Sequence, residues 1–168
     1  MKICYGDLYT DENLAKYDWV GFTANSVVKR DGSLVMGAGN AKQVRDMFDG
    51  LDKRLGQKVK RIRKYFIVSD SETKVFALQT KLHYKDNSPI DLVGESCQVL
   101  RVHAENNPDQ LFAVPCPGVN HGRLSVEDVM VFLEKMPDNV HIWFKEGVSG
   151  SMLHEDIGIR DHDGSDVC

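Results

Sequence analysis

Two short glycine-containing stretches combine residue types that suit the binding of phosphate groups. Residues 36–41 read MGAGNA and residues 116–123 read CPGVNHGR, and each stretch stands shortly before a predicted helix. The N–H groups at a helix start are unpaired and carry partial positive charge, and glycine lets the backbone approach a ligand closely. Two such loops suit a diphosphate better than one, although a tight strand-to-helix turn would also explain each loop by itself.

The polar residues in and around these loops offer several kinds of chemistry. Histidine is the commonest general acid or base in enzymes, so His121 could take that role in phosphate-monoester hydrolysis, although an exposed loop histidine is the simpler explanation. Asn25 and Asn40 could position a water molecule beside the bond that breaks. Lys42 could neutralise a phosphate or lie on the surface, whereas Cys116 is more typical of a buried structural thiol than of a nucleophile.

The composition is that of one ordinary globular domain. The chain has 168 residues, of which 42% are hydrophobic and 27% charged, with a formal net charge of −4. This charge argues against nucleic acid as a partner, and the basic run Lys53–Lys64 is better explained as a solvated helix face. The segment Glu155–Asp166 is acidic.

The cysteine pattern and the apolar runs predict a cytoplasmic protein. The cysteines at 4, 97, 116 and 168 form no Cys-x-x-Cys pair, so we expect neither a disulfide framework nor a metal site, and no cofactor. Residues 1–12 contain no long apolar segment, and no run of 18 apolar residues occurs, so we expect no signal peptide and no membrane association.

Strand and helix patterns alternate along the chain. Apolar runs predict strands at 1–5, 19–23, 66–69, 75–79, 111–115 and 141–144, and helical periodicity predicts helices at 38–48, 52–65, 89–105 and from 125 onward. Ser88 before Pro89 is typical of a helix N-cap, and Ser125 with Asp128 resembles a capping box. The alternation predicts an α/β sandwich whose ligand lies at the carboxyl ends of the strands.

The last 22 residues differ in character from the rest. Residues 147–168 are rich in Gly, Ser and Asp and lack clear periodicity, so we expect a domain at 1–146 followed by a C-terminal tail. The tail either packs as an appendage or remains mobile.

Five segments, taken together, resemble one known family. The standard loops G-x-x-x-x-G-K-[ST] and G-x-G-x-x-G are both absent. In order along the chain, however, GDL (6–8), FTANS (22–26), MGAGNA (36–41), QTKLHY (79–84) and VPCPGVNHGRL (114–124) are similar to motifs of the macro domain family. They resemble the branch that contains ADP-ribosyl hydrolases and ADP-ribose 1''-phosphate phosphatases, over roughly Ile3 to Phe144.

This resemblance implies a three-layer α/β/α fold with a mixed central sheet and an ADP-ribose pocket. Asp7 would accept a hydrogen bond from the adenine amino group, Phe144 or Trp143 would pack near the adenine or proximal ribose, and Asn25 would contact the distal ribose. The other implied ligand contacts are Leu8, the first loop at Gly37, Ala38, Gly39 and Asn40, and the diphosphate-wrapping second loop at Gly118, Val119, Asn120, His121 and Gly122.

The sequence departs from the family pattern at two places in the second loop. Asn120 stands where the family usually has glycine, and Gly122 stands where the hydrolases with a Lys–Asp pair have the aspartate. The resemblance places the nucleophilic lysine of those hydrolases in the helix after the glycine loop, where this chain has Lys42, Arg45 and Asp46. A covalent Lys–Asp mechanism is therefore in doubt.

Three functions remain open from the sequence. The first is an enzyme that removes phosphate from ADP-ribose 1''-phosphate, or an ADP-ribosyl adduct from a macromolecule. The second is a non-catalytic module that binds ADP-ribose or a related nucleotide. The third is nucleic-acid binding through the basic segment, which the negative net charge and the lack of interleaved aromatic residues disfavour.

Overall fold

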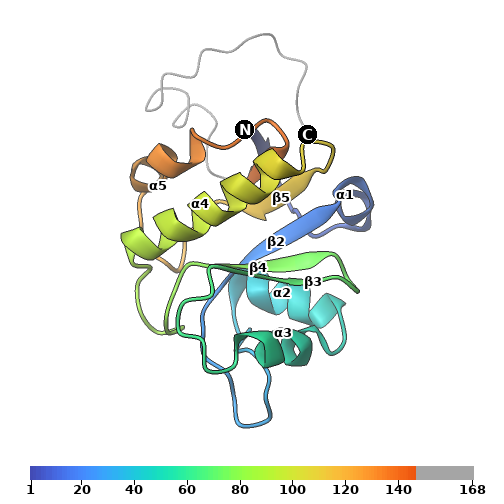
Figure 1. Ribbon diagram of the computed structural model, residues 1–168, viewed down its shortest axis with the longest axis vertical. Coiled ribbons are helices and arrows are strands. Elements are labelled where there is room, and N and C mark those ends of the chain that lie inside the picture. Colours follow the sequence, from blue (N-terminus) through green and yellow to red (C-terminus); the bar gives the residue numbers. More distant parts are fainter. Residues whose placement is uncertain (147–168) are drawn as a thin grey trace.

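A mixed six-stranded sheet forms the centre of the molecule (Figure 1). The structure is a computed structural model and describes residues 1–146. The strands lie in the order β1-β6-β5-β2-β4-β3, and all neighbours are parallel except the β3–β4 pair. Their bounds are Lys2–Tyr5 for β1, Trp19–Ala24 for β2, Ile67–Asp70 for β3, Val75–Gln79 for β4, Phe112–Pro115 for β5 and Val140–Phe144 for β6.

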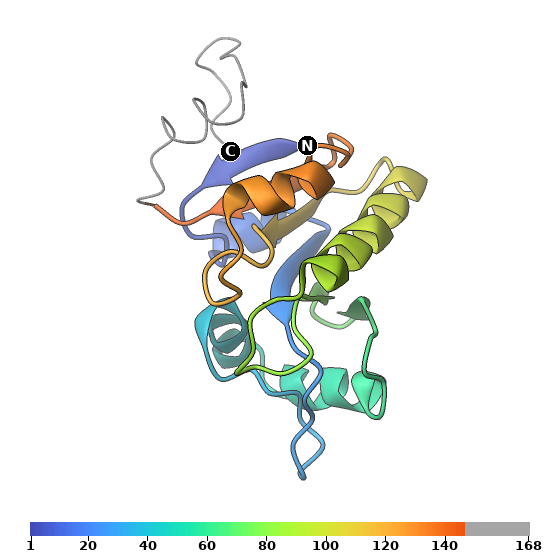
Figure 2. The ribbon, with the colours of Figure 1, turned by 90° about the vertical axis from the view of Figure 1, so that its left-hand side faces the viewer.

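Helices cover both faces of this sheet. In Figure 1, α4 and α5 lie above the sheet and α2 and α3 lie below it, and Figure 2 shows the same separation from the side. The helices span Asp11–Lys16 for α1, Gly39–Met47 for α2, Leu51–Val59 for α3, Ile90–Asn106 for α4 and Val126–Leu133 for α5. The prediction of a three-layer α/β/α sandwich with a mixed sheet is confirmed.

The sheet separates two hydrophobic cores. The core beneath it contains Phe22 of β2 and Leu55 of α3, and Leu14 of α1 packs against its edge. The core above it contains Leu78 of β4 and Leu100 of α4. Every residue of β4 and of β6 is buried, as expected for strands covered on both faces. The buried layers hold the carboxyl ends of the strands in fixed positions, and the site is built there.

Two helices differ from the sequence prediction. Helix α1 was not predicted, although Thr10 caps it by accepting a hydrogen bond of 3.1 Å from the Asn13 N–H. Helix α3 ends at Val59 instead of residue 65, because the chain turns there toward β3 with Arg61 at a φ of +67°. Ile62 consequently lies outside the helix and is 46% exposed, where a continuous helix would have buried it.

The two predicted helix caps have different outcomes. Ser125 and Asp128 form the predicted capping box, with hydrogen bonds of 3.0 and 3.1 Å. Ser88 does not cap α4: the N-cap position belongs to Pro89, and the Ser88 hydroxyl is buried without a hydrogen-bond partner. The Ser88 N–H donates instead to the carbonyl oxygen of Gly122 at 3.0 Å, so this serine supports the second glycine loop.

Candidate functional site

The two glycine loops lie together because β2 and β5 are adjacent, parallel strands. The chain leaves β2 toward the glycine loop and α2, and it leaves β5 toward the second loop and α5, so both loops emerge at one edge of the sheet. Figure 2 shows the loop between β5 and α5 beside the start of α2. A cavity of about 920 Å³ lies between them and is lined by Asn25, residues 37–40 and residues 118–123.

A second cavity of about 470 Å³ adjoins the first. Its lining includes Asp7, Leu8, Trp143 and Phe144. The two cavities share part of their lining, which makes them one continuous cleft; the shared residues are Asn40, Cys116, Val119, Asn120 and Lys145. The structure thus brings all the predicted site residues to one cleft, and each of its two cavities has a volume in the range of small-molecule sites.

The side chains of Asn40 and Asn25 shape the wall of the larger cavity. The Asn40 Oδ1 atom accepts from the Thr23 N–H at 2.9 Å, which ties the start of α2 to β2. Asn25 accepts from the Val27 N–H at 2.9 Å and donates to the Val35 carbonyl oxygen at 3.0 Å. These bonds close the base of a hairpin whose two arms pair between Val28 and Leu34. Each asparagine keeps one amide N–H without a partner among residues 1–146, so each can still donate to a ligand.

The second loop has no room for a side chain at its last glycine. A Cβ atom at Gly122 would lie 2.3 Å from the carbonyl oxygen of Gly118 and 2.3 Å from the Ser88 Oγ. Gly118 itself has a φ of +76°, a conformation that favours glycine. This packing leaves no room for a side chain such as aspartate at position 122 unless the local backbone moves.

Lys81, to which the sequence assigns no chemical role, lies in the larger cavity. The Lys81 Nζ atom donates to the His121 carbonyl oxygen at 2.8 Å, and burial together with the charge of Arg123 lowers the pKa of Lys81. Lys42, the lysine considered from sequence, lies outside both cavities and pairs with Asp46 at 2.8 Å. The signal for Lys81 is a charged residue two positions after the end of the buried strand β4.

The larger cavity is strongly basic although the chain has a net charge of −4. Its charged lining residues are all cations: Lys29, Arg45, Lys81, Lys85, Arg123 and Lys145. Clustered cations in a concave site raise the local concentration of anions. The smaller cavity instead has both signs of charge, with Asp7 and Glu146 beside Lys145.

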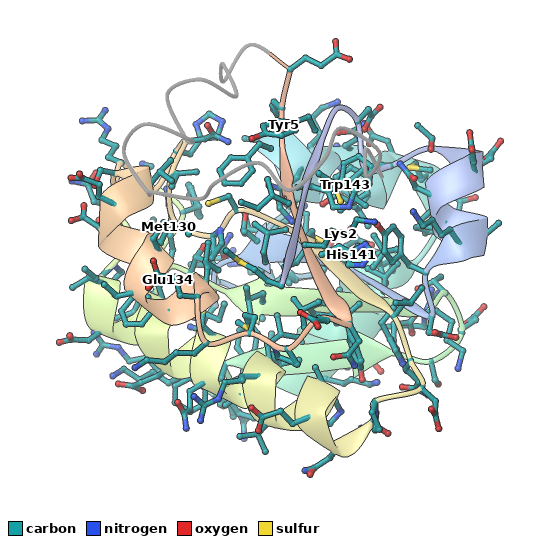
Figure 3. The ribbon with its side chains drawn as sticks, turned by 90° about the horizontal axis from the view of Figure 1, so that it is seen from above. Lys2, Tyr5, Met130, Glu134, His141 and Trp143 are labelled. Carbon is teal, nitrogen blue, oxygen red and sulfur yellow. The ribbon has the colours of Figure 1, made fainter. Side chains whose placement is uncertain are left out.

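The wall of the smaller cavity is built on a buried polar cluster. Trp143 donates through Nε1 to the Tyr17 hydroxyl at 3.3 Å, and this hydroxyl is hydrogen-bonded to His141 Nδ1 at 2.7 Å. Figure 3 shows His141 and Trp143 on the side of β6 that faces away from Met130 of α5 and from Glu134, the C-cap of that helix. The cluster fixes the orientation of the indole ring that lines the cavity.

Three other kinds of site find no support among the described residues. Burial raises the pKa of the Cys116 thiol well above neutrality, so this cysteine is protonated and unsuited to nucleophilic attack. In the part of the chain that the structure describes, no group of three His, Cys, Asp or Glu side chains could hold a metal ion. None of the helices within residues 1–146 has the length and apolar character that a membrane crossing requires.

Comparison with known proteins gives matches among solved structures. No protein-family model matches the sequence, and no curated protein matches it. The macrodomain of Thermus aquaticus DarG superposes with a TM-score of 0.67 at 21% identity, covering 86% of this chain and 97% of that chain. The macrodomain of Mycobacterium tuberculosis DarG gives 0.62 at 25% identity, covering 84% and 96%.

A further match is a structure with a bound ligand. Thermosipho africanus DarTG in complex with ADP-ribose superposes with a TM-score of 0.68 at 18% identity, covering 92% of this chain and 44% of that chain. The mixed sheet with a helical layer on each face and the superpositions indicate the same fold. The chain therefore has the macrodomain fold.

Proposed function

We propose that the chain binds ADP-ribose or a derivative along the cleft and hydrolyses a bond at its distal end. The adenine lies in the smaller cavity against Phe144, where Asp7 accepts from its amino group. The diphosphate lies where the two cavities meet, between the N–H groups of the two glycine loops, and the distal ribose enters the larger cavity near Asn25.

The observation that carries this proposal is the shape and charge of the joined cavities. A largely apolar slot that contains the Asp7 carboxylate suits a base with an amino group, and the glycine loops between the cavities suit two phosphates. The six cations of the larger cavity exceed the charge of a diphosphate, which favours a ligand with a further anionic group at its distal end. The bound ADP-ribose of the DarTG structure supports the same ligand class.

ADP-ribose 1''-phosphate fits this description, and His121 is the group we assign to its hydrolysis. Water attacks the phosphorus atom, the bond between phosphorus and the C1'' oxygen breaks, and His121 gives a proton to the leaving oxygen. The loop places the imidazole beside Gly39, at the wall of the larger cavity. Asn25 and Asn40 hold the distal ribose through their remaining amide N–H groups.

Removal of an ADP-ribosyl adduct is a second candidate, favoured by Lys81. An amine with a lowered pKa is more often neutral and can attack C1'' as its bond to the adduct breaks; water then releases the ribose from the lysine. Lys81 lies in the larger cavity, where C1'' would be. The absence of an acidic partner at Gly122 makes this the weaker candidate.

The test is calorimetric titration with ADP-ribose and then with ADP-ribose 1''-phosphate, followed by an assay of phosphate release. Binding with release that is lost in His121→Ala, but kept in His103→Ala on the exposed end of α4, supports the phosphatase. Binding without release points to a non-catalytic module, or to adduct removal that Lys81→Ala abolishes and Lys42→Ala does not. No binding of either ligand refutes the proposal.

A further inference from the structure

A glutamine from α2 contacts the carboxylate proposed to read the base. The Gln43 Nε2 atom lies 3.1 Å from Asp7 Oδ1 and 3.3 Å from Asp7 Oδ2, so the amide spans both oxygens of a residue 36 positions away. Both side chains line the smaller cavity. Asp7 Oδ1 also accepts from the Tyr9 N–H at 2.9 Å, which fixes the carboxylate from the other side.

This contact determines which way the Gln43 amide points. An ionised carboxylate only accepts hydrogen bonds, so the NH₂ group of Gln43 must face Asp7 and its oxygen must face away. Among the described residues no donor reaches this Gln43 Oε1 atom. Asp7 and Gln43 both lie at the polar edge of the smaller cavity, which we call its rim, and Asp7 Oδ2 and Gln43 Oε1 give this rim two acceptor atoms. The Leu8 N–H at the same cavity has no partner within residues 1–146 and is available as a donor.

We propose that Gln43 determines which purine the cleft accepts, an inference that rests on the proposed binding of ADP-ribose. The walls of the smaller cavity include Leu8, Val119 and Phe144, and apolar surfaces stack on any purine with little discrimination. The identity of the base must therefore be read at the polar rim. Gln43 holds the Asp7 carboxylate toward the cavity and adds its own oxygen as a second acceptor.

Two acceptors select a base with an exocyclic amino group over one with a carbonyl. The amino group of adenine has two N–H donors, one for each acceptor. Hypoxanthine has an oxygen at the same ring position, and this oxygen would face the two acceptor atoms without a proton between them. Asp7 is exposed and Gln43 is half-buried, so the bound base itself would cover these acceptors. Polar groups that a ligand covers and leaves unpaired reject it more strongly than a change of apolar contact does.

The experiment compares ADP-ribose with inosine diphosphate ribose, which carries hypoxanthine and is otherwise identical. Calorimetry gives the dissociation constants of both ligands for the unmodified protein, for Gln43→Met and for Met47→Gln. Gln43→Met keeps the length of the side chain and removes the amide. Met47→Gln is the matched control, because Met47 lies on the same helix, is 37% exposed and lines neither cavity.

We expect the unmodified protein and Met47→Gln to prefer ADP-ribose at least tenfold. In Gln43→Met the affinity for ADP-ribose falls about fivefold or more while that for the inosine ligand stays the same or rises, so most of the preference disappears. An unchanged preference in Gln43→Met overturns the role of Gln43, and so does an unmodified protein that binds both ligands equally. A protein that binds no ADP-ribose overturns the proposed function itself.

Discussion

Gly39 stands where the two loops touch. It begins α2 with a φ of +57°, and a Cβ atom there would lie 3.3 Å from the Cδ2 atom of His121. Glycine adopts this left-handed conformation freely, whereas a β-branched residue is strained in it. The position therefore combines a backbone requirement with a close approach to the second loop, next to the proposed diphosphate.

Replacing Gly39 should damage binding more than it damages folding. In Gly39→Val the strained backbone costs about 1–2 kcal/mol of stability, and the side chain enters the space between Gly39 and His121. We expect the affinity for ADP-ribose to fall at least fiftyfold in calorimetry, while a thermal melt still shows a cooperative transition. Gly37→Ala is the control for strain, because a Cβ at Gly37 meets no atom within 4 Å, and its stability should be unchanged. A Gly39→Val protein with normal affinity would contradict this account of the loop.

At this scale the sequence identifies loops more readily than side-chain contacts. Glycines next to a helix start are visible as a pattern, and the predicted loop residues all reach the cleft. Lys81 and Gln43 could not be found in the same way. Their roles depend on where β4 ends and on which face α2 turns toward Asp7, and both are consequences of packing between distant segments.

A two-pronged ion pair joins α3 to the edge strand β3. The Arg54 guanidinium donates to Asp70 at 2.9 and 3.1 Å, and Asp70 also accepts from Thr73 N and Oγ1 at 3.1 and 2.6 Å. Asp70 is only 4% exposed, and the hydrogen bonds from Arg54 lower the pKa of this carboxyl below its ordinary value. Without Arg54, the buried Asp70 carboxylate would keep its hydrogen bonds from Thr73 but would lose the positive charge beside it.

Arg54→Ala should therefore destabilise the fold by about 1–3 kcal/mol. The value lies at the low end for buried pairs because the Arg54 side chain is partly exposed to water. Urea unfolding at neutral pH measures this difference. Lys53→Ala, an exposed cation on the same helix, is the control and should change the free energy of unfolding by less than about 0.5 kcal/mol. Equal effects of the two substitutions on the free energy of unfolding would show that the Arg54–Asp70 pair does not stabilise the fold.

At the scale of elements, periodicity predicted the sheet and the long helices, and tertiary packing decided the rest. The stripe Val93, Cys97, Leu100 and Ala104 is buried as its spacing predicts. Helix α1 is too short for its periodicity to be recognised, and the basic segment after Val59 looks helical although the chain must turn there to reach β3. Ser88 has the residue type of a cap, but the second loop takes its N–H and buries its hydroxyl.

Within residues 1–146, His141 is a buried histidine whose protonation opposes folding. Burial, followed by the charges of Lys16, Lys2 and the N-terminus, lowers the pKa of His141 to about 4. The ordinary value of about 6.5 applies in the unfolded chain. Below pH 6.5 the unfolded state therefore binds this proton before the folded state does, so stability falls as the pH drops from about 6.5 toward 4.

His141→Asn should remove part of this sensitivity to acid. Between pH 7 and pH 5 the unmodified protein should lose about 1 kcal/mol more stability than the variant, after allowance for screening by solvent. Urea midpoints at the two pH values measure the difference, and asparagine retains an acceptor for the Tyr17 hydroxyl. Carboxylates titrate equally in both proteins, so they cancel in the comparison. An identical loss in the two proteins would assign the acid sensitivity to other groups.

The pairing of β1 with β6 joins two strands that the ribosome makes at different times. Lys2 lies opposite His141 and Tyr5 opposite Phe144, so β1 is made well before its partner β6 (Figure 3). At roughly 5–20 residues per second, the ribosome needs on the order of 10–30 s to produce the second strand. During that interval β1 is an unpaired strand, and the wall of the smaller cavity at Trp143 and Phe144 does not yet exist. The nascent protein can therefore form the proposed ligand site only after β6 has been made and has paired with β1.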